Sequence, residues 1–217
     1  MTRILHVTWH VVPLSLPLAQ RHCSTCGGPR LFHCSGKVRL NANGRRLDAW
    51  LIYKCQACDR TWNLPILDRT PVAEVPPAEL SAMQASDPAW VRSRAFDLAA
   101  LRRHVPQVIL PTDLAVTKQV PGTGSGDWSR IVLAIEAPWP IGLRLDRLLA
   151  HELDLSRSSL QAMMGTGALG IERGSRTALK TALAGSVVLR FDFDGIAAST
   201  RTDLARAFGP PPPGEGL

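Results

Sequence analysis

Residues 23–58 read CSTCGGPRLFHCSGKVRLNANGRRLDAWLIYKCQAC and hold two Cys-x-x-Cys pairs that are separated by 28 residues. Between the pairs, Asn43-Gly44 connects two runs of strand-forming residues, and Asn-Gly at such a junction is the strongest short-range signal of a β-hairpin. The second pair follows the second arm of this hairpin directly. The hairpin would bring the two pairs together, which is the topology of a zinc ribbon.

Four thiolates at this spacing predict a closed tetrahedral zinc site, with the ligands Cys23, Cys26, Cys55 and Cys58. A catalytic zinc keeps one open coordination position, so a complete set of four cysteines predicts a structural ion. The alternative is a redox dithiol, which usually has a single Cys-x-x-Cys pair at the start of a helix. Cys34 belongs to neither pair and is expected to be a free thiol in the core.

The charge is concentrated at the start of the chain. The formal net charge is +7, and residues 1–70 hold ten Lys or Arg against three Asp or Glu. Such an excess favours an acidic partner, and nucleic acid is a usual candidate. The apolar start contains two His and two Pro and is too short to span a membrane, so a membrane partner is not expected. We expect an unprocessed, cytoplasmic protein.

Residues 144–171, RLDRLLAHELDLSRSSLQAMMGTGALGI, predict two consecutive amphipathic helices. Ser156 is placed as the N-cap of the second helix. Arg157 and Ser158 then face outward near the helix N-terminus, where free N–H groups and the helix dipole favour a phosphate. The alternative is a pair of helices that only pack against the core.

The order Arg-Leu-Asp-x-x-Leu, Ser-Arg-Ser-x-Leu, Gly-x-Leu-x-Ile and Ala-Gly-Ser-Val-Val-Leu over residues 141–193 resembles the RNA-binding domain named for the fourth small-subunit ribosomal protein. In that family the two helices and the loop beside them bind structured RNA and recognise its backbone and shape. The RNA contacts predicted for this segment are Arg144, Arg147, Ser156, Arg157, Ser158 and Lys180. The hairpin is predicted to provide a second phosphate-contacting surface, made by Lys37, Arg39, Arg45 and Arg46.

Three further stretches resemble an uncharacterised bacterial family, domain of unknown function 1062. They are CSTCGGP, SGKVRLNANGRRLDAWLIYKCQACDRTWN and RLDRLLAHELDLSRS. This resemblance implies the architecture and no activity.

Together these patterns predict an α+β protein with a helical middle, in which Asp87 caps a helix that starts at Pro88. The predicted domains are a zinc ribbon (1–70), a helical segment (71–106), a loop and strand connector (107–140), an RNA-binding-like α/β domain (141–193) and a tail with a disordered end (194–217).

We expect a non-catalytic, zinc-containing protein that binds structured ribosomal or transfer RNA. No Ser-His-Asp, Cys-His or paired-carboxylate order supports catalysis. Two alternatives stay open: a DNA-binding regulator, and a protein-interaction adaptor that uses the zinc ribbon.

Overall fold

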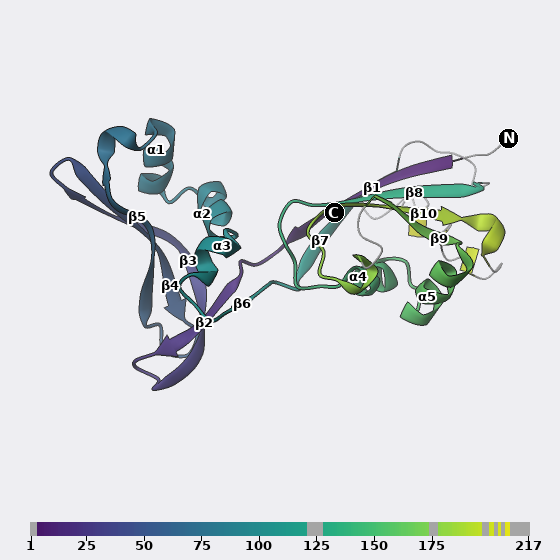
Figure 1. The fold of residues 1–217 in the computed structure, drawn as a ribbon, viewed down its shortest axis with the longest axis horizontal. Helices are drawn as coiled ribbons and strands as arrows, with labels where there is room; N and C mark the ends of the chain where they lie inside the picture. Colours follow the sequence, from purple (N-terminus) through teal and green to yellow (C-terminus); the bar gives the residue numbers. More distant parts are fainter. Residues whose placement is uncertain are drawn as a thin grey trace, which may run out of the picture. The chain divides into compact units, whose positions relative to one another are not determined.

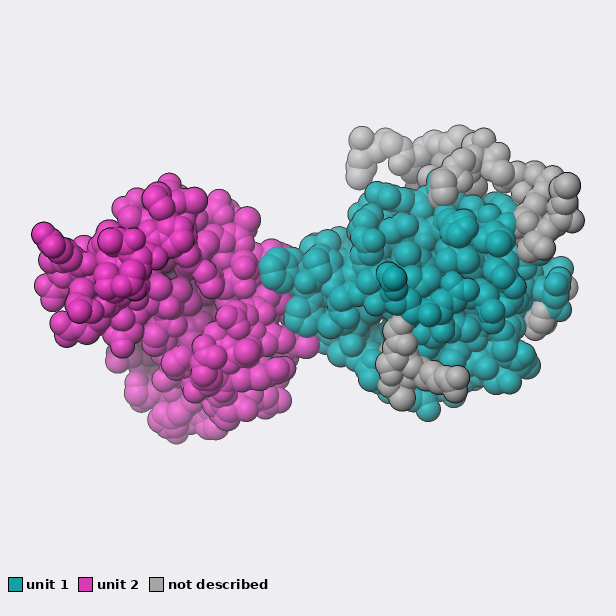
Figure 2. Space-filling view, turned by 45° about the horizontal axis from the view of Figure 1, so that its top comes forward, with its two compact units in different colours: residues 1–14, 112–217 teal, residues 15–111 magenta. Residues whose placement is uncertain are grey.

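The structure is a computed structural model that describes residues 4–120, 128–173 and 178–196, together with positions 200, 201, 204, 207 and 208. The predicted disordered end of the tail, from residue 209 on, lies outside the described residues. The chain forms two compact units, which are coloured separately in Figure 2. Unit 1 holds residues 1–14 and 112–217, and unit 2 holds residues 15–111.

Unit 2 is built on an antiparallel five-stranded sheet with the strand order β5-β4-β3-β2-β6. The strands are β2 (Leu18–Cys23), β3 (Gly28–Asn43), β4 (Arg46–Cys55), β5 (Thr61–Pro71) and β6 (Gln107–Ile109). The predicted hairpin is confirmed, because Asn43 pairs with Arg46 across the turn and Gly44 has a φ of 60° that suits glycine. β4 lies inside the sheet, between β3 and β5.

Short helices cover one face of this sheet. They are η1 (Val72–Glu74), α1 (Pro77–Ala85), α2 (Pro88–Ala95) and α3 (Leu98–Arg102) (Figure 1). The predicted cap of α2 is confirmed, since the Asp87 carboxylate accepts a hydrogen bond from the Trp90 N–H at 2.8 Å. Leu51 and Tyr53 of β4 share a buried cluster with Val91 and Ala95 of α2, so this face of β4 points toward the helices.

Unit 1 contains a mixed five-stranded sheet with the strand order β7-β1-β8-β10-β9. The strands are β1 (Ile4–Pro13), β7 (Leu114–Gln119), β8 (Arg130–Ala137), β9 (Leu169–Arg173) and β10 (Gly185–Asp192). β1 runs parallel to β8, and the other pairs are antiparallel. The remaining described elements are α4 (Leu145–Glu152), α5 (Arg157–Thr166), η2 (Ala178–Lys180) and η3 (Phe193–Gly195). The core of unit 1 joins Trp9 and Leu133 of the sheet with Leu149 of α4 and Leu160 of α5.

The prediction of an α+β fold with a helical middle is wrong, because the described chain is mostly β and is organised around two five-stranded sheets. The middle helices are at most nine residues long and serve as a cover for the sheet of unit 2. The segment after them supplies strands to both sheets, with β6 in unit 2 and β7 and β8 in unit 1. Helix signals in the sequence were local, whereas these strand pairings join distant segments.

Candidate metal centre and basic hollow

Two similar turns in unit 2 hold the four predicted zinc ligands. β2 ends at Cys23, and the Gly27 N–H donates a 2.9 Å hydrogen bond to the Cys23 carbonyl, which folds the chain back into β3. β4 ends at Cys55, and the Asp59 N–H donates to the Cys55 carbonyl at the same distance. Each turn places both cysteines of its pair on one side of the chain. The ladder between β3 and β4 then brings the two turns together, because Phe32 pairs with Cys55.

The four cysteine sulfurs form one compact cluster. The Sγ atoms of the residues Cys23, Cys26, Cys55 and Cys58 all lie within 4.8 Å of one another, and none of them is in a disulfide. The Sγ atoms of Cys23 and Cys58 are 3.5 Å apart. Four thiolates around a tetrahedral zinc ion, at a Zn–S distance of about 2.3 Å, would be roughly 3.8 Å apart. The cluster can therefore hold a metal ion, and its donor set and spacing suit zinc.

The thiols of Cys23 and Cys26 differ in pKa. A hydrogen bond from the backbone of Cys26 lowers the pKa of Cys23 to about 7, whereas the hydrogen bond with Cys58 raises the pKa of Cys26 to about 12. A metal ion binds the thiolate form, so its binding must release protons and must weaken at low pH. Cys34 is outside the cluster, and burial raises the pKa of its thiol.

Unit 1 has a hollow of about 590 Å³ beside α4 and α5. All six of its lining residues are polar or charged: Arg144, Asp146, Arg157, Ser158, Gln161 and Lys180. Arg144 is the N-cap of α4, Arg157 and Ser158 belong to the first turn of α5, and Lys180 ends η2. The fold thus brings together four of the six RNA contacts that were predicted for this segment. Arg147 is exposed on α4 but does not line the hollow.

Ser156 caps α5, as predicted. Its Oγ accepts a hydrogen bond from the Ser159 N–H at 3.0 Å and lies 2.8 Å from the Oγ of Ser158. The Ser156 hydroxyl is therefore engaged by its own helix. Arg157 and Ser158, the next two residues, are exposed.

Gln161 and Asp146 line the hollow but were not predicted as RNA contacts. Of the two, Asp146 is the buried one. Its side chain is only 4% exposed, and it accepts two hydrogen bonds from Arg144, from Nε at 3.0 Å and from Nη2 at 2.5 Å. This bidentate pair fixes the direction of the Arg144 guanidinium at the edge of the hollow. The Arg-x-Asp spacing of residues 144–146 was the signal available in the sequence, but it could not reveal that the carboxylate is buried.

The four predicted cations of the hairpin are all exposed: Lys37, Arg39, Arg45 and Arg46. The Arg39 guanidinium lies over the Trp50 ring, 5.7 Å from its centroid. Arg46 donates a 2.8 Å hydrogen bond to the carbonyl of Arg69. Within the described residues these cations belong to unit 2 and the basic hollow belongs to unit 1, so the predicted contacts form two separate groups.

In the part of the chain that the structure describes, the fold is mostly β, it forms two units, and it brings together four cysteines that could hold a metal ion. Residues 40–174 match the family described as Protein of unknown function (DUF1062), and this match covers more than half of the chain. The chain belongs to this family. The matched region starts within β3 and ends just after β9, so it includes Cys55 and Cys58 but lies after Cys23 and Cys26. No curated protein and no solved structure matches the chain.

None of the helices in the described part of the chain is long and apolar enough to cross a membrane.

Proposed function

We propose that this protein is a non-catalytic RNA-binding protein in which a structural zinc ion stabilises a ribbon in unit 2, and that it binds structured ribosomal or transfer RNA. The observation that carries the proposal is the hollow of unit 1, where Arg144, Arg157 and Lys180 converge from three elements. Phosphate contacts made by such cations supply most of the affinity of sequence-tolerant nucleic-acid binding.

The electrostatics of the hollow support an anionic ligand. The single carboxylate in its lining, Asp146, is already paired with Arg144. Arg157 and Lys180 are exposed, and neither forms an ion pair within the part of the chain that the structure describes. The α5 N-terminus adds the positive end of a helix dipole beside them.

The lining of the hollow favours a backbone over a small molecule. Pockets for small molecules are mostly lined by apolar and aromatic side chains, with a few polar groups that fix the orientation of the ligand. This hollow has polar or charged residues at all six lining positions. The resemblance of residues 141–193 to an RNA-binding domain supports the same ligand.

The test uses the full-length, zinc-loaded protein and a folded transfer RNA across a salt series. We expect the double variant Arg157→Gln/Lys180→Gln to bind at least tenfold more weakly at low salt. The slope of log K against log salt should become shallower by about 1.8, because each lost phosphate contact removes about 0.9 from it.

Arg102→Gln/Arg103→Gln is the matched control, because it removes the same charge from two exposed residues of unit 2 at the end of α3. This control should bind nearly as the wild type does. Equal binding by the two double variants would contradict the proposal. Tighter binding of the wild type to duplex DNA would favour a DNA-binding regulator, and absence of binding to either nucleic acid would favour a protein-interaction adaptor.

A further inference from the structure

The sheet of unit 2 has a second face that its helices leave uncovered. Residues alternate between the two faces of a strand, and the odd-numbered residues of β4 are the buried ones. Trp50, Ile52 and Lys54 therefore point away from α1 and α2, and each of them stays partly exposed. A large aromatic ring on an uncovered face has a free surface on which another planar group can stack.

The neighbouring strands continue this face. Arg39 of β3 is paired with Trp50, and His33 is paired with Lys54, so these side chains stand beside each other on the same side of the sheet. On the other side of β4, Asn63 of β5 is paired with Ile52. We call the set Arg39, Trp50, Ile52, Lys54, His33 and Asn63 the open face.

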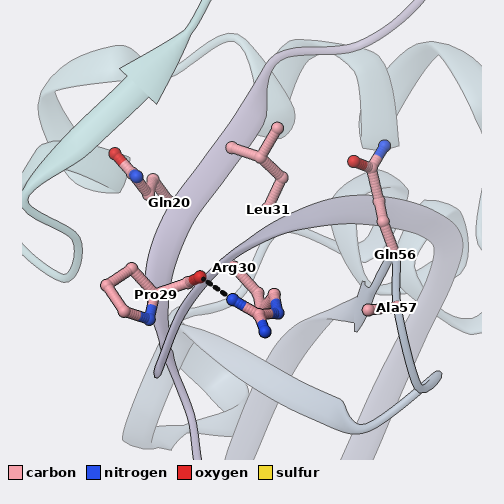
Figure 3. Close-up of a pocket in the computed structure, with 6 residues that line it drawn as sticks. All are labelled: Gln20, Pro29, Arg30, Leu31, Gln56 and Ala57. Atoms are coloured by element: carbon pink, nitrogen blue, oxygen red, sulfur yellow. Dashed lines mark hydrogen bonds between the residues drawn. The ribbon is translucent and has the colours of Figure 1, made fainter. Parts of the chain in front are cut away.

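At the cysteine end of the sheet, the open face leads to a hollow of about 350 Å³. Gln20 of β2 pairs with Leu31 of β3, which lies two residues before His33 on the same side of the sheet. Figure 3 shows Leu31 between Gln20 and Gln56, with Gln56 on the turn that follows β4. From Trp50 to Cys55, where β4 ends, the strand spans about 17 Å at roughly 3.3 Å per residue, enough for a short stretch of extended polymer.

The charge of the open face is positive. Unit 2 holds thirteen Lys or Arg against seven Asp or Glu. Arg39 and Lys54 belong to the open face, and Arg46 lies on the same side of β4. Asp48 is the carboxylate on this side of β4, and its Oδ1 accepts the Arg69 N–H at 2.7 Å. Cations at both ends of a row that contains an aromatic ring suit a ligand with alternating phosphates and planar bases.

We propose that the open face binds unpaired nucleotides of the RNA, with one base stacked on Trp50 and flanking phosphates on Arg39 and Lys54. This proposal rests on the proposed function, and it adds a single-stranded element to the ligand. The Arg39 guanidinium already lies over the Trp50 ring, 5.7 Å from its centroid, so a base would take the remaining ring surface while its phosphate meets the same cation.

The experiment measures binding of fluorescein-labelled oligouridylate of ten nucleotides to the full-length, zinc-loaded protein across a salt series. Trp50→Ala should weaken this binding about tenfold, the range that the loss of one aromatic stacking platform produces. Trp50→Phe keeps a ring at the site and should bind within about twofold of the wild type. Both variants are checked for zinc content and circular dichroism.

A second pair of variants tests the proposal if Trp50→Ala fails to fold. Arg39→Gln/Lys54→Gln should make the salt slope shallower by about 1.4, because each phosphate contact to a single strand contributes about 0.7. Arg102→Gln/Arg103→Gln should leave the slope unchanged. The double variant Arg157→Gln/Lys180→Gln should bind transfer RNA at least tenfold more weakly and retain oligouridylate binding, so the two proposals can fail separately.

Three outcomes would overturn the inference. One is wild-type protein that binds oligouridylate no more tightly than polyglutamate of equal charge. The second is a Trp50→Ala variant that is folded and zinc-loaded and binds as tightly as the wild type. The third is tighter binding to oligodeoxythymidylate than to oligouridylate, which would assign the face to DNA.

Discussion

At the scale of single residues, the ion pair of Arg144 and Asp146 joins two side chains that differ strongly in their exposure to solvent. The carboxylate is almost fully buried, whereas the guanidinium is 39% exposed. A buried charge without a partner is costly, but a half-exposed cation can be hydrated. The two partners are therefore unequal, and removing one should not have the same effect as removing the other.

We expect Arg144→Gln to lower the free energy of unfolding of unit 1 by about 1–2 kcal/mol, after allowance for the exposure of the pair. Asp146→Asn should cost less than about 1 kcal/mol, because Arg144 can turn to solvent. Urea denaturation followed by circular dichroism measures both. Equal losses in the two variants would show that the pair does not stabilise the fold in this way.

Glu152 gives unit 1 a pH-dependent contribution. Burial opposes ionisation of its carboxylate, but hydrogen bonds from Lys118 and His151 outweigh burial and lower its pKa. Nζ of Lys118 lies 2.8 Å from Oε2. A carboxylate with a lowered pKa in the folded state stabilises the fold above its unfolded pKa, and this stabilisation is lost as the pH falls through the folded value.

Lys118→Met should therefore reduce the free energy of unfolding at pH 7 by about 1 kcal/mol. At a pH below both pKa values of Glu152, the variant and the wild type should differ little. Urea titrations of both proteins at several pH values between neutral and acid conditions measure this difference. A difference that stays constant with pH would assign the role of Lys118 to packing, since its ammonium also lies over the Trp9 ring.

At the scale of elements, the cysteine turns were predictable, and the reason is that their signals are local. A Cys-x-x-Cys pair, an Asn-Gly turn and an Asp-Pro helix start each lie within a few residues, and each is found in the structure where the sequence placed it. The open face of the sheet was less predictable. The alternation of β4 predicts that its apolar, odd-numbered residues are buried. Trp50 and Ile52 make the other side partly apolar too, so the sequence alone did not show that the helices would leave that side uncovered.

Cys55→Ser tests the link between the cysteine cluster and the sheet. Cys55 ends the inner strand and is fully buried, so we expect the variant to lose bound zinc and unit 2 to unfold. Mass spectrometry under native conditions measures the zinc, and near-ultraviolet circular dichroism reports the aromatic packing. Cys34→Ser is the matched control and should keep one zinc ion per chain. A folded Cys55→Ser protein with a full complement of zinc would exclude the four-cysteine site.

At the scale of the whole molecule, most of the net positive charge lies in unit 2, whereas the hollow proposed to bind RNA lies in unit 1. This division could not be read from the sequence. Strand β1 was assigned to the ribbon because it precedes the first cysteine pair, but its partners are β7 and β8, more than a hundred residues further along the chain. Nothing in the local pattern of residues 4–13 identifies partners at that separation.

Deletion of residues 1–14 should destabilise unit 1 and leave unit 2 folded. β1 lies between β7 and β8, so its loss splits the sheet of unit 1, whereas unit 2 keeps all of its strands. We expect unit 1 to become sensitive to proteolysis and unit 2 to remain resistant and zinc-bound. Limited proteolysis with mass spectrometry measures both. Protection of residues 130–192 in the truncated protein would contradict the central role of β1.

The parallel pairing of β1 with β8 also sets an order of events during synthesis. Leu5 leaves the ribosome first, but its partner Ile131 follows only after all of unit 2 has been made. At about 5–20 residues per second, this delay lasts roughly 6–25 s. During this delay, unit 2 can fold and bind its metal. The apolar side chains of β1 have no partner strand in that time and are exposed to chaperones or to other nascent chains. Pulse proteolysis of ribosome-bound chains should therefore detect protection of the ribbon before protection of the N-terminal strand.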